Sequence, residues 1–306
     1  MSGPTRHPNQ RSLASLPREL RRTTVPAAVR AWVARETGCT VVRARRLPGA
    51  SSTAVHCLVL SDGRRVVLRR YVWPGFLLDE PIAPRRELDA LHFASAAGLS
   101  APRVVAADAD GSSVGDGIPV ILMTKLAGRA EAVPDLGRLA EVAATIHATD
   151  PAGFRHDYFP WYAGTTTAPP PLAAWPELWE AALAVWHTEM PPFPPCLIHR
   201  DFHPGNVLWV RGRCSGVVDW AGSCRGPWGC DVAHCRENLT RLGGPEVADR
   251  FLAAYEAATG ATYHPYWEVA STLEHGPSGW TPDSVAGAEV RLTAALADLD
   301  RLPRRR

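Results

Sequence analysis

One stretch of the sequence combines residue types that can carry out phosphoryl transfer. His199 and Asp201 follow a short apolar, strand-like segment, and Asn206 comes five residues after Asp201. A second apolar segment, residues 215–218, ends at Asp219. Phosphoryl transfer from a nucleotide needs a carboxylate that orients the attacking hydroxyl, and an amide and a second carboxylate that hold Mg²⁺ against the phosphates. The order and spacing of these residues indicate that chemistry.

The joint pattern resembles the aminoglycoside phosphotransferase family of the protein-kinase-like superfamily. The resemblance covers roughly residues 40–256 and rests on H-x-D-x-x-x-x-N at 199–206, V-V-D-W at 217–220 and a G-P…D stretch at 226–231. It implies an α+β, bilobal protein-kinase-like fold, with a small antiparallel β-rich N-terminal lobe and a larger, mainly helical C-terminal lobe. It also implies an ATP- and Mg²⁺-dependent enzyme that moves the γ-phosphate to a hydroxyl of a small molecule.

The resemblance gives each residue of the motif a role. It implies that Asp201 is the catalytic base and that Asn206 and Asp219 bind Mg²⁺. His199 falls on the histidine that braces the loop around the base. Asp231 is expected to be a structural carboxylate and not a metal ligand.

The motif departs from the family at Arg200, where the small-molecule kinases usually have glycine and protein kinases have His-Arg-Asp. Trp220 and Ala221, however, stand where Phe and Gly would follow the metal aspartate of a protein kinase. No Ala-Pro-Glu closes an activation segment after Asp219. The sequence therefore favours a small-molecule kinase over a protein kinase.

The sequence has almost no lysine with which to bind phosphate. Lys125 is the only lysine among the 33 basic residues, and Leu126 follows it. A phosphate-binding loop of the Gly-Lys-Ser/Thr type is therefore excluded.

The missing positive charge is expected to come from an arginine. Arg69 lies in a V-L-R variant of the family's lysine-bearing strand, and a guanidinium can hold phosphate oxygens through a permanently charged, bidentate fork. The resemblance pairs Arg69 with Glu87. Because strand alternation places Val67 inward and Leu68 outward, Arg70 falls on the opposite face and remains the alternative.

Five further residues are expected to contact the nucleotide. Ser51 and Ser52 lie in a small-residue loop that would cover the phosphates with backbone N–H groups and hydroxyls. Adenine would lie against the connector at 123–126, where Met123 and Lys125 are the candidate contacts. His203 is placed near the transferred phosphate, although a solvent-facing spacer is an equal alternative. The residue pattern does not choose between ATP and GTP.

Hydrophobic periodicity predicts the elements that position these residues. Alternating segments predict a five-stranded antiparallel sheet from residues 41–47, 54–60, 65–71, 103–107 and 118–123. Helical spacing follows at 26–37, 84–97, 136–146, 175–189, 246–258 and 284–302, with short strands at 207–210 and 215–218. We therefore expect a flexible basic leader over 1–24, a nucleotide-binding lobe over 25–123, a hinge connector at 124–128 and a catalytic lobe over 129–306.

The composition narrows the class of protein. With 46% hydrophobic residues, no long apolar run and a net charge of +2, we expect no membrane span and no nucleic-acid partner. Seven cysteines without a CxxC pair indicate reduced thiols, so a cytoplasmic protein is expected. We expect it to be a monomer or a homodimer. The spacing of the cysteines and His234 within 214–235 is too irregular to favour structural zinc.

The segment before His199 bears on the acceptor. No arginine or lysine lies between His156 and His199, whereas four acids and four tryptophans do: Asp157, Glu177, Glu180, Glu189, Trp161, Trp175, Trp179 and Trp186. A second group is expected to close the same pocket: Glu268, Glu274, Asp283, Trp267 and Trp280. Such a surface suits a cationic or polyhydroxylated ligand such as an amino sugar. The alternative is a solvated acidic helix face whose tryptophans pack inward.

Two other functions stay open at this stage. Within the family, the acceptor is either an aminoglycoside-like or other hydroxylated antibiotic, or a metabolite resembling choline, homoserine or a sugar. From a different class, the chain would be a nucleotide-binding pseudokinase with a regulatory role.

Overall fold

The computed structural model describes residues 20, 24–47, 49–50, 52–161, 166–188, 190–274 and 280–302. These residues form two compact units. The sheet unit contains the described residues up to Glu131 together with Asn206–Ser223, and the helical unit contains Ala132–Gly205 and the residues from Cys224 onward. This division differs from the expected one, because residues 206–223 pack with the sheet and not with the helices. The predicted basic leader, 1–24, lies almost entirely outside the described residues.

An antiparallel sheet of five strands is the centre of the sheet unit. Its order is β1-β2-β3-β5-β4, formed by β1 (Val41–Arg46), β2 (Ala54–Leu60), β3 (Arg65–Arg70), β5 (Val120–Thr124) and β4 (Val104–Asp108). Gly63 turns the chain between β2 and β3 with a φ of 84°, which the Asp-Gly pair allows at little cost. The five strands and the α+β class predicted from the sequence are confirmed.

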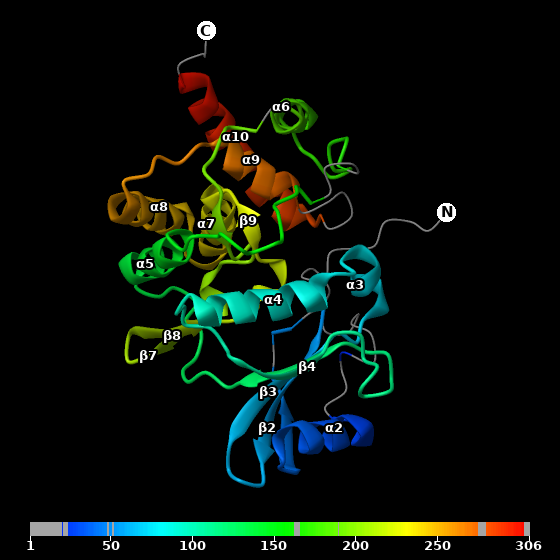
Figure 1. Ribbon diagram of the computed structural model, residues 1–306. Helices are drawn as coiled ribbons and strands as arrows, with labels where there is room; N and C mark the ends of the chain where they lie inside the picture. The colour runs from blue at the N-terminus through cyan, green and yellow to red at the C-terminus, as the bar shows by residue number, and fades with distance from the viewer. Residues whose placement is uncertain are drawn as a thin grey trace. The chain divides into compact units, whose positions relative to one another are not determined.

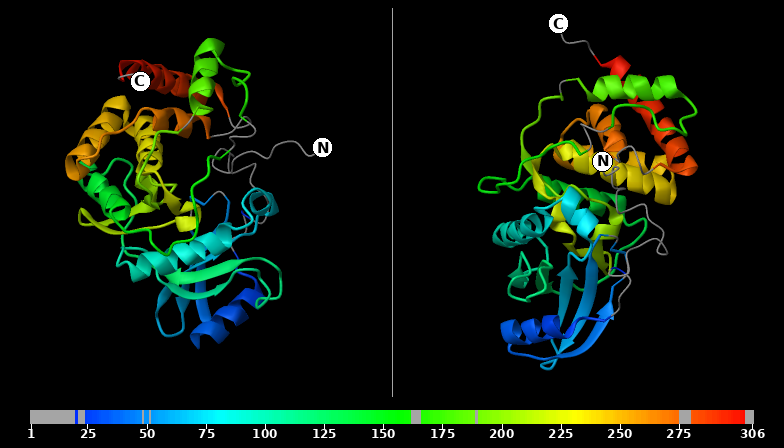
Figure 2. Two further views of the ribbon diagram at one scale, coloured as in Figure 1. Left: turned by 45° about the horizontal axis from the view of Figure 1, so that its top comes forward. Right: turned by 90° about the vertical axis from the view of Figure 1, so that its right-hand side faces the viewer.

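Helices cover both faces of this sheet (Figures 1 and 2). On one face, α2 (Ala27–Thr37) buries Trp32 against Leu58 and Leu68. On the other, α4 (Ala83–Ala96) carries the partner of Arg69. The expectation that Leu68 points outward was wrong, because α2 covers that face and Leu68 is fully buried while Val67 is half-buried. A short helix, α3 (Pro74–Asp79), follows β3 and was not predicted.

A second hairpin belongs to the sheet unit. It pairs β7 (Val207–Val210) with β8 (Arg213–Val217), and the Val217 N–H donates to the Ser100 carbonyl over 2.8 Å. A Cβ on Gly216 would lie 2.7 Å from that same carbonyl oxygen, so the close approach requires glycine. Arg86 on α4 donates to the Ala221 carbonyl over 2.5 Å. These contacts fix the segment that ends at Asp219.

The helical unit consists of six helices and a two-stranded ladder among its described residues. The helices are α5 (Leu136–His147), α6 (Pro176–Trp186), α7 (Trp228–Gly243), α8 (Pro245–Thr259), α9 (Tyr266–Leu273) and α10 (Pro282–Arg301), and the ladder pairs β6 (Cys196–Ile198) with β9 (Cys224–Gly226). The sequence did not predict α7 or α9, and α7 carries the buried acids Asp231 and Glu237 among its buried apolar residues. No helix in the described ranges is long and apolar enough to cross a membrane.

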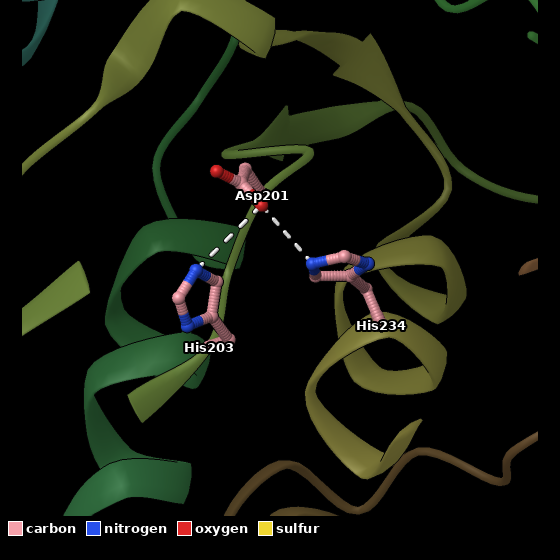
Figure 3. Close-up of side chains that lie close together, drawn as sticks. All are labelled: Asp201, His203 and His234. Atoms are coloured by element: carbon pink, nitrogen blue, oxygen red, sulfur yellow. Dashed lines mark ion pairs between the residues drawn. The ribbon is translucent and has the colours of Figure 1, made fainter. Parts of the chain in front are cut away.

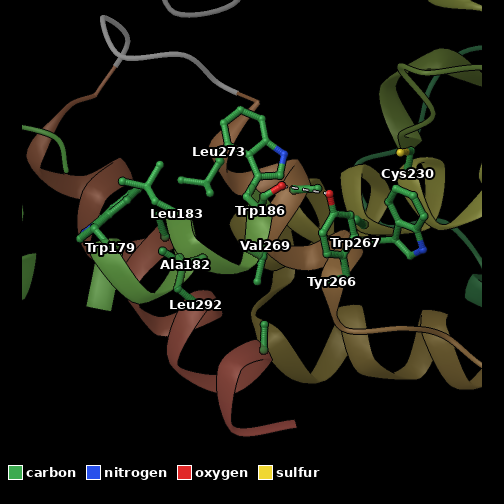
Figure 4. Close-up of a cluster of buried hydrophobic side chains, with 14 of the residues drawn as sticks. Trp179, Ala182, Leu183, Trp186, Cys230, Tyr266, Trp267, Val269, Leu273 and Leu292 are labelled. Atoms are coloured by element: carbon green, nitrogen blue, oxygen red, sulfur yellow. Dashed lines mark hydrogen bonds between the residues drawn. The ribbon is translucent and has the colours of Figure 1, made fainter. Parts of the chain in front are cut away.

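Aromatic side chains form the core of the helical unit (Figure 4). Trp179 and Trp186 of α6 lie in one buried cluster with Trp267 of α9 and Leu292 of α10. The indole N–H of Trp179 donates to Glu289 over 3.0 Å, so its polar atom is satisfied inside the core. These tryptophans therefore hold four helices together.

Two helical glycines give a matched test of this packing. A Cβ on Gly229 would lie 2.2 Å from the Trp267 ring, whereas a Cβ on Gly287 would meet only a flexible arginine tip at 3.9 Å. We expect Gly229→Ala to lower the free energy of unfolding by about 1–3 kcal/mol through overpacking. Gly287→Ala should instead raise it by about 0.5–1 kcal/mol through helix propensity. Urea denaturation of both variants measures the difference, and equal effects would contradict the packing of α7 on α9.

Candidate active site

A buried carboxylate fixes the backbone that leads to Asp201. Asp231, in the first turn of α7, is fully buried and accepts the N–H groups of His199 and Arg200 over 2.7 and 2.6 Å. His147 on α5 contacts the same carboxylate over 3.1 Å. Burial alone would raise the pKa of Asp231, but the hydrogen bond and charge of His147 hold that pKa below its ordinary value. Asp231 thus has the geometry of a structural group.

Arg200 holds this loop from its other side. Its φ of 68° is in the left-handed region, where a residue with a Cβ is strained. The guanidinium lies 3.0 Å from the Glu274 carboxylate, and its carbon lies 4.3 and 4.0 Å from the ring centroids of Tyr158 and Trp161. The ion pair and these cation–π contacts offset the backbone strain. They also occupy Glu274, which was expected in a ligand pocket.

Two imidazoles face the carboxylate of Asp201 (Figure 3). The Nε2 atom of His234, on α7, lies 3.0 Å from Oδ1, and the Nε2 atom of His203 lies 3.8 Å from the same oxygen. Burial would raise the pKa of Asp201, but the hydrogen bond from His234 and the charges of both imidazoles hold it well below its usual range. Asp201 is therefore ionised at neutral pH.

His234 is a site residue that the sequence did not identify. The sequence suggested His234 only as a weak zinc ligand, because His234 and Asp201 are far apart in the chain and come together only in the folded protein. The usable signal was its spacing from Asp231: positions three apart lie on one side of a helix. His199 is fully buried and its backbone N–H donates to Asp231, while the bracing role expected of its side chain stays a prediction.

The two predicted Mg²⁺ ligands lie in the sheet unit. Asn206 is largely buried, and its carbonyl accepts the N–H of Val218 over 2.9 Å, which ties it to the residue before Asp219. Asp219 has left-handed backbone angles, φ 69° and ψ 60°, and its side chain is 33% exposed. An amide oxygen and a carboxylate are donors that suit Mg²⁺.

Arg69 joins two carboxylates in the same unit. Its Nη1 atom lies 3.0 Å from Glu87 Oε1 and 2.6 Å from Asp219 Oδ1, so the predicted ion pair with Glu87 is present. The Tyr71 hydroxyl donates to the second oxygen of Glu87. Burial acts to lower the pKa of Arg69, but Asp219 and Glu87 raise it above the ordinary value. Arg70 instead pairs with Asp116 on the opposite face.

The remaining nucleotide candidates lie in three places in the chain. Met123 is buried within β5. The ammonium group of Lys125 donates a hydrogen bond to the Leu126 carbonyl over 3.0 Å. Ser52 is half-buried just before β2, and Ser51 lies outside the described residues. In the helical unit, His203 Nδ1 accepts the N–H of Gly205 over 3.0 Å.

The expected acidic and aromatic pocket is not supported. Trp179, Trp186 and Trp267 belong to the core, while Glu268 pairs with Arg236 over 3.0 Å. Asp157 pairs with Arg225, and Glu274 with Arg200. Glu177 and Glu180 are exposed on α6, and Glu189 lies outside the described residues. The alternative, a solvated acidic helix face over inward-packed tryptophans, describes α6 better.

Comparison with known proteins gives a consistent picture. A family model described as the phosphotransferase enzyme family matches residues 43–273. The homoserine kinase of Mesorhizobium japonicum is 30% identical over 161 residues, which are 45% of this chain and 48% of that kinase. The match therefore spans about half the length of this relative.

Solved structures share the fold. A thermostable mutant of an aminoglycoside phosphotransferase, in ternary complex with ADP and hygromycin B, is 19% identical, with a TM-score of 0.61 over 89% of this chain and 98% of that one. A macrolide 2′-phosphotransferase from Brachybacterium faecium is 19% identical, with a TM-score of 0.55 over 92% of this chain and 100% of that one. These likenesses confirm the kinase-like fold class predicted from the sequence.

Removal of the Arg69 guanidinium should destabilise the sheet unit. Arg69→Met would leave the Glu87 carboxylate, whose side chain is only 1% exposed, without its cation. We expect a loss of about 3–5 kcal/mol in the free energy of unfolding, measured by urea denaturation. Arg64→Met, which breaks only exposed contacts with Asp62, the Thr37 carbonyl and Cys39, is the control and should unfold like the parent. A stable Arg69→Met variant would contradict a charged Glu87 at this site.

Proposed function

We propose that this chain, which belongs to the phosphotransferase enzyme family, transfers the γ-phosphate of ATP to a hydroxyl group of a small molecule with the help of Mg²⁺. The observation that carries the proposal is the Arg69 guanidinium, held by the buried Glu87 and in contact with the half-exposed Asp219. A fixed cation beside an accessible carboxylate suits the phosphates and the metal of a nucleotide.

The residues of the sheet unit fit both groups. The Nε atom of Arg69 is buried and has no hydrogen-bond partner among the described residues, so a phosphate oxygen would satisfy it. Asn206 and Asp219 would hold Mg²⁺, which neutralises charge on the phosphate oxygens when it is bound. Arg69 performs the task usual for a lysine, but its charge cannot be lost by deprotonation.

Asp201 has the properties of a group that orients the acceptor. Its carboxylate is ionised and its side chain is 27% exposed, so it can accept the proton of an incoming hydroxyl in a hydrogen bond. Because its pKa is held low, it is a weak base before the reaction. In a loose transition state the hydroxyl proton becomes acidic only as its oxygen bonds to phosphorus, and it then passes to Asp201.

The acceptor is a hydroxylated small molecule. The relatives act on or bind acceptors of that kind, from homoserine to hygromycin B. A metabolite acceptor is the second candidate, and the homoserine kinase match favours it. Glu268 and Glu274 already form ion pairs with arginines of this chain, so they give no support to a cationic acceptor. A cytoplasmic location is part of the proposal, supported by seven free cysteine thiols.

An acceptor panel tests the function. The full chain is incubated with Mg-ATP, or Mg-GTP, and with aminoglycosides, macrolides, homoserine, choline or sugars, and ADP or GDP release is measured. Acceptor-dependent release, with a phosphorylated product seen by mass spectrometry, is expected for one class of acceptor. Nucleotide binding without transfer to any acceptor would instead indicate a pseudokinase.

Asp201→Asn should separate transfer from binding. The amide cannot take the hydroxyl proton, so we expect kcat to fall by about 10²–10⁴-fold. The Kd for Mg-ATP, measured by calorimetry, should stay near that of the parent. Asp298→Asn, an exposed position on α10, is the control and should be fully active. Normal turnover by Asp201→Asn would remove Asp201 from the mechanism.

A further inference from the structure

We propose that His234 is a positioning residue that acts through Asp201. Its imidazole N–H binds Oδ1 of Asp201 and so fixes the orientation of the carboxylate that receives the acceptor hydroxyl in phosphate transfer. This inference rests on the proposed function, because it assigns a task to the carboxylate only in phosphate transfer. His234 itself is not expected to touch the reacting atoms.

One helix controls both the backbone and the side chain of the base. Asp231 and His234 stand three residues apart on α7. Asp231 binds the N–H groups of His199 and Arg200, and His234 binds the carboxylate of Asp201 itself, over 3.0 Å. Two contacts from one rigid helix therefore limit both the peptide position and the rotation of the carboxylate. Such double support is what keeps a catalytic group within its productive geometry.

The neighbours of His234 decide which atom donates. Arg241 donates to the Asn238 Oδ1 over 2.7 Å, so the amide NH₂ of Asn238 faces His234 and donates to its carbonyl over 2.9 Å. The same NH₂ lies 3.2 Å from His234 Nε2, and the Asp201 carboxylate lies 3.0 Å from that same nitrogen. Between a neutral amide donor and an anionic acceptor, the charge-assisted bond is the stronger one, so Nε2 carries the proton and donates to Asp201.

His203 cannot replace this contact. Its Nδ1 accepts the Gly205 N–H, so in the neutral ring Nε2 bears the proton. That N–H approaches Oδ1 only to 3.8 Å, beyond hydrogen-bond range. Asp201, His203 and His234 also lie close enough to hold a metal ion, but both Nε2 atoms would first have to lose their protons. The hydrogen-bond pattern thus favours a carboxylate held by His234 over a metal centre.

Three variants test the inference in the full chain. His234→Phe removes the donor and keeps the ring, and His234→Gln keeps a donor N–H. His187→Phe, at the exposed end of α6, is the matched control. Transfer from Mg-ATP to water, homoserine and hygromycin B is followed by ADP release. We expect His234→Phe to lower kcat by about 10–100-fold with an unchanged KM for ATP, and His234→Gln to recover most of kcat.

An NMR titration of His234 tests the contact without any turnover. The pKa of His234 is raised above its ordinary value because the hydrogen bond and charge of Asp201 outweigh burial, which acts to lower it. Asp201→Asn should therefore lower this pKa. The charges that face His234 from its own helix, Glu237 and Asp231, are unchanged in that variant, as is His203 on the loop. An unchanged pKa would overturn the contact.

The outcomes separate the two proposals. Parent-like kcat in His234→Phe, or equal losses in the Phe and Gln variants, would overturn the positioning role while leaving the proposed function intact. Tight Zn²⁺ binding by the parent, lost in His234→Phe, would replace the positioning role by a metal site. A parent protein that transfers phosphate to no acceptor of the full panel of aminoglycosides, macrolides, homoserine, choline and sugars, although His234 titrates as expected, would overturn the proposed function and with it the role.

Discussion

The carboxylate of Asp231 is completely buried, and this is tolerable only because it accepts two backbone N–H groups and contacts His147. Those N–H groups belong to His199 and Arg200, the two residues before Asp201. The loop that carries the candidate base thus supplies the hydrogen bonds that stabilise the buried charge of Asp231. Loss of the loop geometry would leave that charge unpaired, so the helical core and the loop must form together.

In the sheet unit, a buried cation has the corresponding role. Arg69 stands between the fully buried Glu87 and the more exposed Asp219, and its desolvation is offset by contact with both. Glu87 is in turn bound by Tyr71, so three side chains fix the orientation of one guanidinium. Because arginine stays charged at any physiological pH, this arrangement supplies a constant positive charge where a lysine could titrate.

The sequence predicted what depends on local pattern. The five strands, most helices and the Arg69–Glu87 pair followed from alternation, spacing and motif. It missed α7, in which the buried acids Asp231 and Glu237 lie among buried apolar residues such as Val232, Cys235 and Leu239. It also missed the contact of His234 with Asp201 and the burial of Leu68, because each depends on which element packs against it. The sequence also could not show that Asp157, Glu268 and Glu274, which were expected in an acidic pocket, form ion pairs with arginines in the folded protein.

The left-handed Arg200 also limits how this sequence can change. Glycine at this position would relieve the backbone strain, yet it would leave the Glu274 carboxylate without its cation and the Tyr158 and Trp161 rings without the guanidinium between them. The benefit of a substitution at 200 therefore depends on what stands at 274. The two positions form an epistatic pair: neither can be exchanged alone without cost, and the order of replacement determines which contacts are lost first.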